Sequence, residues 1–247
     1  MYRFYVEEEQ IRDNRIAITG SDVNHIKNVL RMGIGEKVIV CNGQGMDYYA
    51  VIEEQTKEEI LLSTLEKKPT KSELQGKIYL FQGGPKKDKM ELIIQKAVEL
   101  GVYEIIPVMM KRTIVKLEDK KKELKKLERW QAIAASAAKQ SGRGIIPKIT
   151  ETKTLTEALT YGKDLDCKIV PYENAEGISK TRKIMSELNS NTSVGIFIGP
   201  EGGFEEIEIS QAMKEGYSPV TLGKRILRTE TAGLTVLSMV MLQMEQD

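Results

Sequence analysis

The chain has 247 residues, with 37 lysine and arginine residues against 36 aspartate and glutamate residues, so its formal net charge is only +1. A charged fraction of 30% and a hydrophobic fraction of 40% are typical of a folded globular protein and argue against disorder. The near-zero net charge excludes a uniformly basic nucleic-acid binder. A chain of this length has room for one large domain or for two smaller ones.

Cysteine and histidine are scarce. Cys41, Cys167 and His25 are too few for a disulfide framework, a four-thiolate zinc site or a site with two histidine ligands. We therefore expect no metal. The N-terminal segment is acidic and aromatic, unlike a secretory signal, and no run of about 18 apolar residues occurs. We expect a cytoplasmic protein that does not associate with a membrane.

Residues 1–70 are predicted to form a small domain of short strands. Five segments alternate apolar and polar residues or are rich in β-branched residues, and glycine, asparagine and aspartate separate them. These segments span residues 2–6, 15–19, 37–43, 47–55 and 59–66. One short helix interrupts them, with Ser21 or Asp22 as its expected N-cap and Gly-Ile-Gly at residues 33–35 as its end. Five strands and one small helix predict a small β-barrel.

The remainder of the chain has a different pattern. Residues 67–76 are polar and predict a linker, and short apolar runs then alternate with long amphipathic segments over residues 76–247. This alternation predicts an α/β domain with a mainly parallel sheet. The expected strands are 77–82, 103–108, 167–172, 194–199 and 219–222. The expected helices are 89–100, 117–140, 176–189, 205–215 and 230–244, and the apolar face of the last is wide enough for the core or for a subunit interface.

A glycine-rich loop, Gly-Pro-Glu-Gly-Gly at residues 199–203, follows an apolar strand and leads into an acidic helix start. Its glycines permit positive φ and close approach of a ligand, and ligands bind at the carboxyl ends of strands in open α/β sheets. A tight turn without a ligand is the alternative. Glu205 and Glu206 would repel a phosphate at the helix start, so a neutral or cationic ligand fits better.

A second loop, residues 221–232, also connects a strand to a helix. Lys224, Arg225 and Arg228 make it basic, Glu230 follows, and Thr229 is expected to cap the last helix. A solvated turn is the alternative explanation for the three cations. Because the two loops leave consecutive strands, we expect them to lie close together.

Further basic residues lie at the ends of predicted strands and helices elsewhere in the α/β half of the chain. They include Lys86, Lys87 and Lys89, Lys111 and Arg112, and Lys139 and Arg143. Gathered on one rim, they would form a polyanion-binding cleft, whereas spread out they would be ordinary solubility charges. The sequence leaves both interpretations open.

The two loops together carry a family resemblance. Residues 199–203, followed by Leu-Gly-Lys-Arg-Ile-Leu-Arg-Thr-Glu-Thr-Ala at 222–232, resemble the small-subunit (16S) ribosomal RNA uridine-N3 methyltransferase family of the SPOUT superfamily. The opening at 2–6, the His-x-x-x-Val-Leu-Arg-like element at 25–31, the stretch 89–102 and the Gln-Ser-Gly-Arg stretch at 140–143 also resemble that family. Lys139 stands where the family pattern has glutamate. The resemblance covers nearly the whole chain.

This resemblance implies a PUA-like RNA-binding β-barrel at residues 1–70 and an α/β SPOUT methyltransferase domain with a trefoil knot at residues 76–247. It implies a homodimer that uses S-adenosylmethionine to methylate uridine N3 in 16S rRNA within the small ribosomal subunit. The matching motifs imply a set of cofactor-binding residues. They are Val170, Pro171, Ile198, Gly199, Pro200, Glu201, Gly202, Gly203, Leu222, Gly223, Ile226, Leu227, Arg228, Thr231 and Ala232.

Methyl transfer to uracil N3 requires that the N3 proton leaves and that the base is unpaired. We expect Arg228 to stabilise the uracil anion and Glu230 to orient Arg228. Glu230 or Glu201 could instead act as a general base. His25 is expected to be structural, because it lies in the barrel.

RNA binding is expected to be mainly electrostatic. The candidates are Arg3 and Arg31 on the barrel and Lys86, Lys87, Arg112 and Arg143 on the catalytic domain. Two other functions stay open at this point. One is a non-catalytic RNA- or ribosome-binding protein, which would bind no cofactor, and the other is a methyltransferase that acts on a different RNA base.

Overall fold

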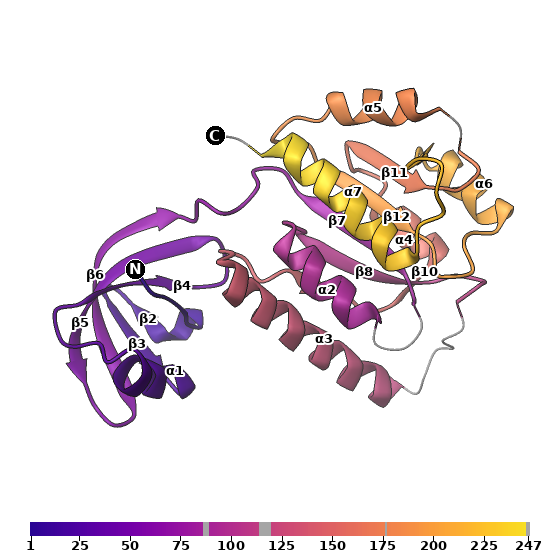
Figure 1. Ribbon diagram of the computed structural model, residues 1–247. Coiled ribbons are helices and arrows are strands. Elements are labelled where there is room, and N and C mark those ends of the chain that lie inside the picture. Colours follow the sequence, from indigo (N-terminus) through magenta and orange to yellow (C-terminus); the bar gives the residue numbers. More distant parts are fainter. Residues whose placement is uncertain (86–88, 114–119, 176, 246–247) are drawn as a thin grey trace. The chain divides into compact units, whose positions relative to one another are not determined.

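The computed structural model describes residues 1–85, 89–113, 120–175 and 177–245 (Figure 1). The chain divides into two compact units, one formed by residues 1–73 with 138–146 and the other by 74–137 with 147–247. The division falls inside the predicted linker. Residues 138–146 join the first unit, although the sequence analysis placed them in the catalytic domain, so the N-terminal domain is discontinuous in sequence.

The first unit is built on a six-stranded sheet with the order β1-β4-β5-β6-β3-β2. Its strands are β1 (Arg3–Tyr5), β2 (Ile11–Arg12), β3 (Arg15–Thr19), β4 (Lys37–Cys41), β5 (Met46–Gln55) and β6 (Glu59–Pro69). The alternating residues of β3 show why these segments form strands, since Ile16 and Ile18 are buried and Arg15 and Thr19 are exposed. β1 and β2 form the two edges, so the sheet is a partly open barrel.

The helical part of this unit differs from the single helix expected there. A 3₁₀ turn, η1 (Glu8–Gln10), precedes it, and the helix α1 (Ser21–Asn24) continues directly into a π-helical turn, η2 (His25–Val29). Gly20, not Ser21 or Asp22, is the N-cap of α1. The exposed residue Arg31 follows with φ of 53°, which is a left-handed conformation that side chains other than glycine and asparagine rarely adopt.

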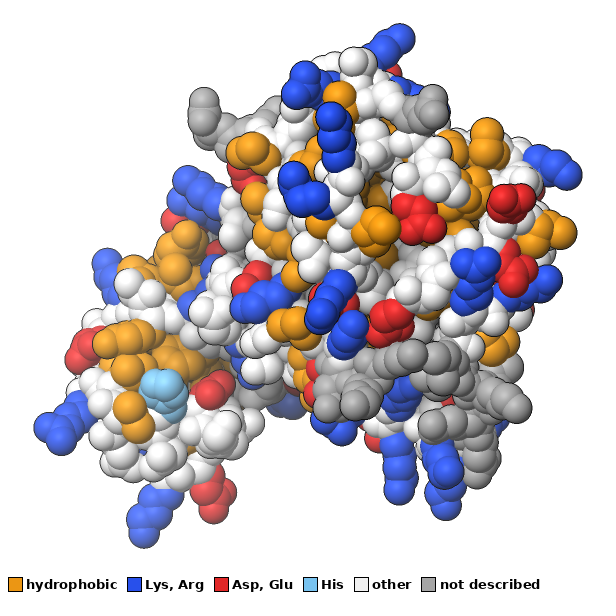
Figure 2. Space-filling view, turned by 45° about the vertical axis from the view of Figure 1, so that its right-hand side comes forward, with side chains coloured by type: hydrophobic (Ala, Val, Ile, Leu, Met, Phe, Trp, Pro, Cys, Tyr) orange, Lys and Arg blue, Asp and Glu red, His pale blue; other side chains and the backbone are white. Residues whose placement is uncertain are grey.

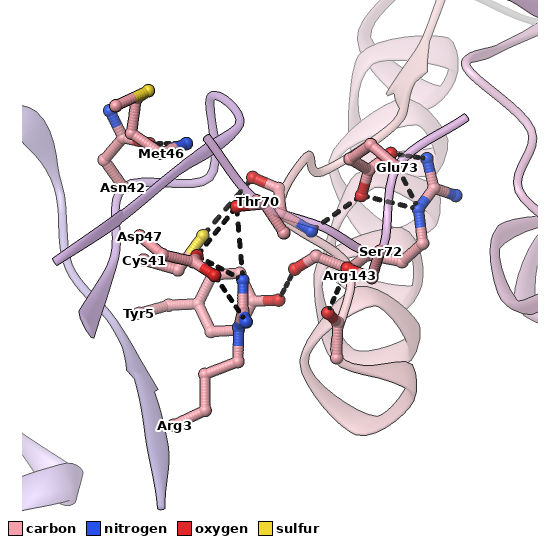
Figure 3. Close-up of polar contacts among 12 residues, drawn as sticks. Arg3, Tyr5, Cys41, Asn42, Met46, Asp47, Thr70, Ser72, Glu73 and Arg143 are labelled. Carbon is pink, nitrogen blue, oxygen red and sulfur yellow. Dashed lines mark hydrogen bonds and ion pairs between the residues drawn. The ribbon is translucent and has the colours of Figure 1, made fainter. Parts of the chain in front are cut away.

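Residues 138–146 are held in the first unit by polar contacts (Figure 3). The hydroxyl of Tyr5 donates to the carbonyl of Arg143, and burial raises the pKa of Tyr5 to about 12. Gly144 O accepts from the backbone N–H of Gly45 at 2.8 Å and from the thiol of Cys41 at 3.3 Å. The segment therefore satisfies backbone groups of the turn between β4 and β5.

Two arginines of this unit form internal ion pairs (Figure 3). Arg143, whose side chain is 5% exposed, contacts Glu73 through Nη2 at 2.7 Å. Arg3 pairs with Asp47 through Nη2 at 2.6 Å, and Asp47 also accepts from the hydroxyl of Thr70 at 2.7 Å. Because both guanidinium groups are engaged inside the unit, the expected phosphate contacts of Arg3 and Arg143 are replaced by structural roles. Thr70, Ser72 and Glu73 also form hydrogen bonds within this unit, so this part of the predicted linker is not free.

The second unit contains a parallel sheet with the order β10-β8-β7-β12-β11-β13, and β9 also pairs with β8. The strands are β7 (Ile78–Gly83), β8 (Glu104–Met109), β9 (Lys148–Ile149), β10 (Lys153–Thr154), β11 (Cys167–Pro171), β12 (Val194–Ile198) and β13 (Ser218–Val220). The helices are α2 (Lys89–Glu99), α3 (Lys120–Ser141), α4 (Leu155–Tyr161), α5 (Ile178–Ser186), α6 (Glu206–Lys214) and α7 (Thr229–Met244), and residues 138–141 at the end of α3 belong to the first unit. The predicted α/β class is confirmed.

Helices cover both faces of this sheet, and the period-two alternation of the strands decides what each face contacts. On one face, Phe81 and Phe197 stack with their ring centroids 5.1 Å apart, in a core cluster that includes residues of α4 and α6. On the other face, α2 and α7 lie side by side (Figure 1), and Gly233 of α7 faces Gln82 and Ile198. α4 was not expected from the sequence, although Thr154 and Glu157 form its capping box.

The buried pair of Glu73 and Arg143 predicts a large stability loss when one partner is removed. Glu73→Ala leaves the Arg143 guanidinium buried without its carboxylate, which we expect to lower the free energy of unfolding by about 3–5 kcal/mol. Urea unfolding of the full chain measures this loss. Glu66→Ala is the matched control, because Glu66 pairs with Lys68 on the surface with 52% of its side chain exposed, and we expect a loss of at most about 1 kcal/mol. Equal losses in both variants would contradict the structural role of Glu73.

Candidate active site

The glycine-rich loop leaves the carboxyl end of β12, as expected, but its glycines serve different purposes. Gly203 has φ of 70°, and its N–H donates to Pro200 O at 2.9 Å to close the turn. Gly199 and Gly202 are needed for space, because a Cβ at either position would lie 3.0 Å from the side chain of Phe204 or of Arg112. Positive φ is therefore required at one of the three positions only.

The end of β7 approaches this loop at backbone distance. A Cβ on Gly83 would lie 2.7 Å from the backbone nitrogen of Pro200, so no larger residue fits there. Just before it, the fully buried amide of Gln82 donates to Thr229 Oγ1 at 2.9 Å, and the Thr229 hydroxyl donates to Gly199 O at 2.6 Å. Three segments that are far apart in sequence thus meet in one chain of hydrogen bonds.

The basic loop after β13 leads into α7 in a way that corrects one expectation. Arg228 is the N-cap of α7, and its backbone carbonyl accepts from Ala232 N at 2.8 Å. Thr229, which was expected to cap the helix, is its first residue and is buried against the end of β12. Its hydroxyl donates to Gly199 O of the glycine-rich loop, and the Arg228 side chain is exposed.

The two loops surround a cavity of about 430 Å³ together with the end of β11 and the start of α2. This confirms the expectation that the loops lie close together. The cavity is lined by most of the expected cofactor-binding residues, but Val170, Gly202 and Thr231 lie outside its lining. The expected lining residues are Pro171, Ile198, Gly199, Pro200, Glu201, Gly203, Leu222, Gly223, Ile226, Leu227, Arg228 and Ala232. Lys89, Tyr172, Glu173, Phe204, Thr221, Lys224, Arg225 and Thr229 complete it.

Two charged residues of the lining, Lys89 and Glu201, meet Glu230, which lies outside the lining. Lys89 Nζ lies 3.3 Å from Glu201 Oε1 and 3.2 Å from Glu230 Oε2. The side chains are 32%, 23% and 15% exposed, so water screens the group only in part. Hydrogen bonding to Glu230 raises the pKa of Lys89, and that to Glu201 raises it further, so the amine stays protonated at neutral pH. Glu230 is therefore paired with Lys89 in the structure, whereas we had expected it to orient Arg228.

Gln82 was not singled out in the sequence analysis, and Lys89 was named there only among the basic residues of a possible polyanion-binding cleft. Gln82 interrupts an otherwise apolar strand, and Lys89 lies in the first turn of a helix, where the helix dipole disfavours a cation. Both are exceptions to a local rule, and each has a partner distant in sequence. Such exceptions are the signal by which these two residues could have been found.

The remaining RNA-binding candidates have mixed outcomes. Lys86 and Lys87 lie outside the described residues. Arg112 is exposed, and its Nη1 donates to Gly202 O at 2.8 Å, next to the cavity.

At the start of α6, a carboxylate of the protein accepts hydrogen bonds from the nearby backbone. The buried Glu208 accepts from the backbone N–H groups of Lys111 at 3.0 Å and Glu205 at 2.8 Å.

Known proteins and family models resemble this chain over most of its length. Residues 72–241 match the model of an RNA methyltransferase domain, and residues 18–65 match that of an RNA methyltransferase PUA domain. The ribosomal RNA small subunit methyltransferase E of Bacillus subtilis is 38% identical over 99% of this chain and 98% of its own length. The chain belongs to the ribosomal RNA small subunit methyltransferase E family.

Members of this family share both units of the structure. The protein of that name from Mesomycoplasma hyopneumoniae is 38% identical over 96% of this chain and 98% of its own length. The crystal structure of the Neisseria gonorrhoeae methyltransferase E bound to S-adenosyl methionine is 33% identical, covers 96% of this chain and 95% of its own, and superposes with a TM-score of 0.78. The likeness therefore covers the PUA domain as well as the methyltransferase domain.

Two further findings concern the described residues alone. No group of three or more histidine, cysteine, aspartate or glutamate residues there is arranged to hold a metal ion. None of the helices in the described ranges combines the length and apolar character needed to cross a bilayer.

Proposed function

We propose that the protein methylates N3 of a uridine in 16S ribosomal RNA, within the small ribosomal subunit, with S-adenosylmethionine as the methyl donor. The observation that carries the proposal is the cavity in which the 199–203 and 221–232 loops, whose sequences carry the family resemblance, come together. An rRNA substrate also agrees with a cytoplasmic location for the reaction.

The lining of the cavity fits S-adenosylmethionine. A volume of about 430 Å³ lies within the range of about 300–1,000 Å³ that is usual for small-molecule sites. Ile198, Leu222 and Leu227 offer an apolar surface for an adenine ring. Glu201 and Glu173 provide carboxylates for a ligand that carries ammonium and sulfonium charges. When bound, the cofactor supplies an electrophilic methyl group.

Methylation at N3 requires residues of the chain to stabilise negative charge on the uracil. Loss of the N3 proton leaves negative charge on the ring and its O2 and O4 atoms. Arg228 is exposed at the cavity and permanently cationic, so it is suited to stabilise that charge. Glu230 follows it in the chain and is held by Lys89, which fixes the carboxylate beside the cavity. We propose Arg228 as the electrostatic stabiliser and Glu230 as the second catalytic residue, whose carboxylate accepts the N3 proton.

The decisive experiment is to map the methylated nucleotide. Purified protein is incubated with radiolabelled S-adenosylmethionine and small ribosomal subunits that lack the modification. We expect label on uridine N3. Label on another base would keep the methyltransferase activity and overturn the proposed target. Absence of label together with absence of cofactor binding by calorimetry would favour a non-catalytic RNA-binding role.

Arg228 is predicted to act on the chemical step. Arg228→Ala removes the guanidinium, and we expect single-turnover methylation at saturating cofactor and RNA to slow by about 10²–10³-fold. Arg182→Ala is the matched control, because Arg182 is an exposed arginine of α5 outside the cavity lining, and its rate is expected to be unchanged. A near-normal rate in correctly folded Arg228→Ala would remove Arg228 from the mechanism.

RNA contacts are proposed separately for each unit. On the first unit, Arg31 is exposed and occupies a backbone conformation that costs about 1–3 kcal/mol and often marks a functional site. On the second unit, Arg112 lies next to the cavity, and Lys86 and Lys87 precede α2. Figure 2 shows basic and acidic side chains interspersed over one face of the protein, so single placed arginines and not a broad basic field are the expected contacts.

Phosphate contacts have a measurable salt dependence. Arg31→Ala and Arg112→Ala are each expected to reduce the slope of log K against log salt by about one unit in RNA-binding titrations. Cofactor affinity is measured in parallel for Arg112→Ala, because that side chain also bonds to the glycine-rich loop. A slope that stays unchanged after both substitutions would overturn these contacts.

We also propose that the protein is a homodimer. Leu242 of α7 is 76% exposed and Ile226 of the basic loop is 85% exposed, and apolar side chains this exposed suit an interface that covers them. Sedimentation at twice the 27.8 kDa of the chain is expected, and a monomer at all concentrations would contradict the dimer.

We further propose that the second unit contains a trefoil knot. The support is that β11 lies between β12 and β13 while both loops line one cavity. An unknotted path in an experimental electron density map would contradict the knot.

A further inference from the structure

Lys89 occupies an unfavourable position unless it has a specific partner. It is the first residue of α2, where the helix dipole is positive and a cation is destabilised. Its ammonium nevertheless lies at the wall of the cavity between Glu201 and Glu230, at 3.3 and 3.2 Å. The attraction of the two carboxylates for the ammonium exceeds the unfavourable effect of the helix dipole. The contacts with Glu201 and Glu230 therefore explain the position of Lys89.

The three residues come from three different parts of the chain. Lys89 begins α2 after β7, Glu201 lies in the loop after β12, and Glu230 lies in the first turn of α7 after the basic loop. Since both carboxylates are within 3.3 Å of one nitrogen, they are also close to each other. Without the ammonium, two partly buried negative charges would repel and favour separation of the glycine-rich loop from α7.

A second, uncharged network joins the same three parts of the chain. Gln82 at the end of β7 donates to Thr229 of α7, which donates to Gly199 O at the start of the glycine-rich loop. This network is buried and fixes the base of the junction. Lys89 joins the same segments at the cavity wall, where a ligand would contact them.

We propose that Lys89 is a positioning residue that assembles the cofactor site by holding Glu201 and Glu230 together. It acts through the two carboxylates and not by contact with the reacting atoms. The loop and the start of α7 are thereby fixed before the cofactor binds, so that less ordering is needed on binding. This inference rests on the proposed function, because it takes S-adenosylmethionine as the ligand of the cavity.

The first test is the affinity of the full chain for S-adenosylmethionine by titration calorimetry. Lys89→Met removes the ammonium and keeps most of the apolar stem, and we expect the Kd to rise about tenfold, as residues coupled through a shared network commonly show. Lys89→Arg keeps the charge and is expected to stay within about threefold of wild type. Lys96→Met is the matched control, because Lys96 lies on the same helix and pairs with Glu99 at 2.8 Å. It is expected to leave the Kd unchanged.

The second test separates positioning from a general loss of structure. In the variant Lys89→Met/Glu230→Gln the repulsion between the carboxylates is gone while Glu201 keeps its carboxylate at the cavity, and we expect the Kd to return to within about threefold of wild type. Recovery after a further substitution is the opposite of what accumulated structural damage gives. A double variant that binds no better than Lys89→Met would overturn the action of Lys89 through the two carboxylates.

The wild-type titration distinguishes the two levels of inference. If wild type binds S-adenosylmethionine and Lys89→Met binds it equally well, the positioning role of Lys89 is wrong and the proposed function stands. If wild type shows no binding, both are overturned. If Lys89→Met weakens binding, Lys89→Arg preserves it and the double variant Lys89→Met/Glu230→Gln restores it, the positioning role is established.

Discussion

The catalytic unit depends on one close backbone approach, that of Gly83 at the end of β7 to Pro200 in the loop after β12. Only glycine allows it, since a Cβ would lie 2.7 Å from the Pro200 nitrogen. The approach brings Gln82 within hydrogen-bond distance of Thr229, and Thr229 within reach of Gly199 O. Because these strands are parallel, their carboxyl ends meet at one edge of the sheet, and the loops that follow them enclose the cavity.

Much of the catalytic unit could be predicted from local sequence patterns. The strands and helices of the second unit follow the alternation of apolar runs and amphipathic segments, and the two ligand loops stand out by glycine and charge. The strand order could not be predicted in this way, because periodicity shows which face of a strand is buried but not which strand lies beside it. The short strands β9 and β10 were missed, and so was the helix α4, although Thr154 and Glu157 form a recognisable capping box.

Arginines show the limit of interpreting charge from sequence. Arg143 and Arg31 both belong to stretches that resemble family motifs, yet one is buried beside Glu73 and the other is exposed. Their difference arises from contacts about 70 residues apart in the chain, since Glu73 and Arg143 meet only after residues 138–146 join the first unit. A long-range carboxylate partner decides whether an arginine serves the fold or a ligand, and no local pattern reveals that partner.

The two networks at the junction of β7, β12 and α7 complement each other physically. The network of Gln82 and Thr229 is neutral and buried, so its contribution is insensitive to salt and holds the base of the junction in one arrangement. The contacts of Lys89 with Glu201 and Glu230 are charged and partly exposed, so their strength depends on what occupies the cavity beside them. A ligand that excludes water from the cavity would strengthen these ion pairs as it binds. The folded junction and the bound ligand would then stabilise each other through the same ammonium group. Lys89 would thereby affect ligand binding more than its own contact area with the ligand would predict.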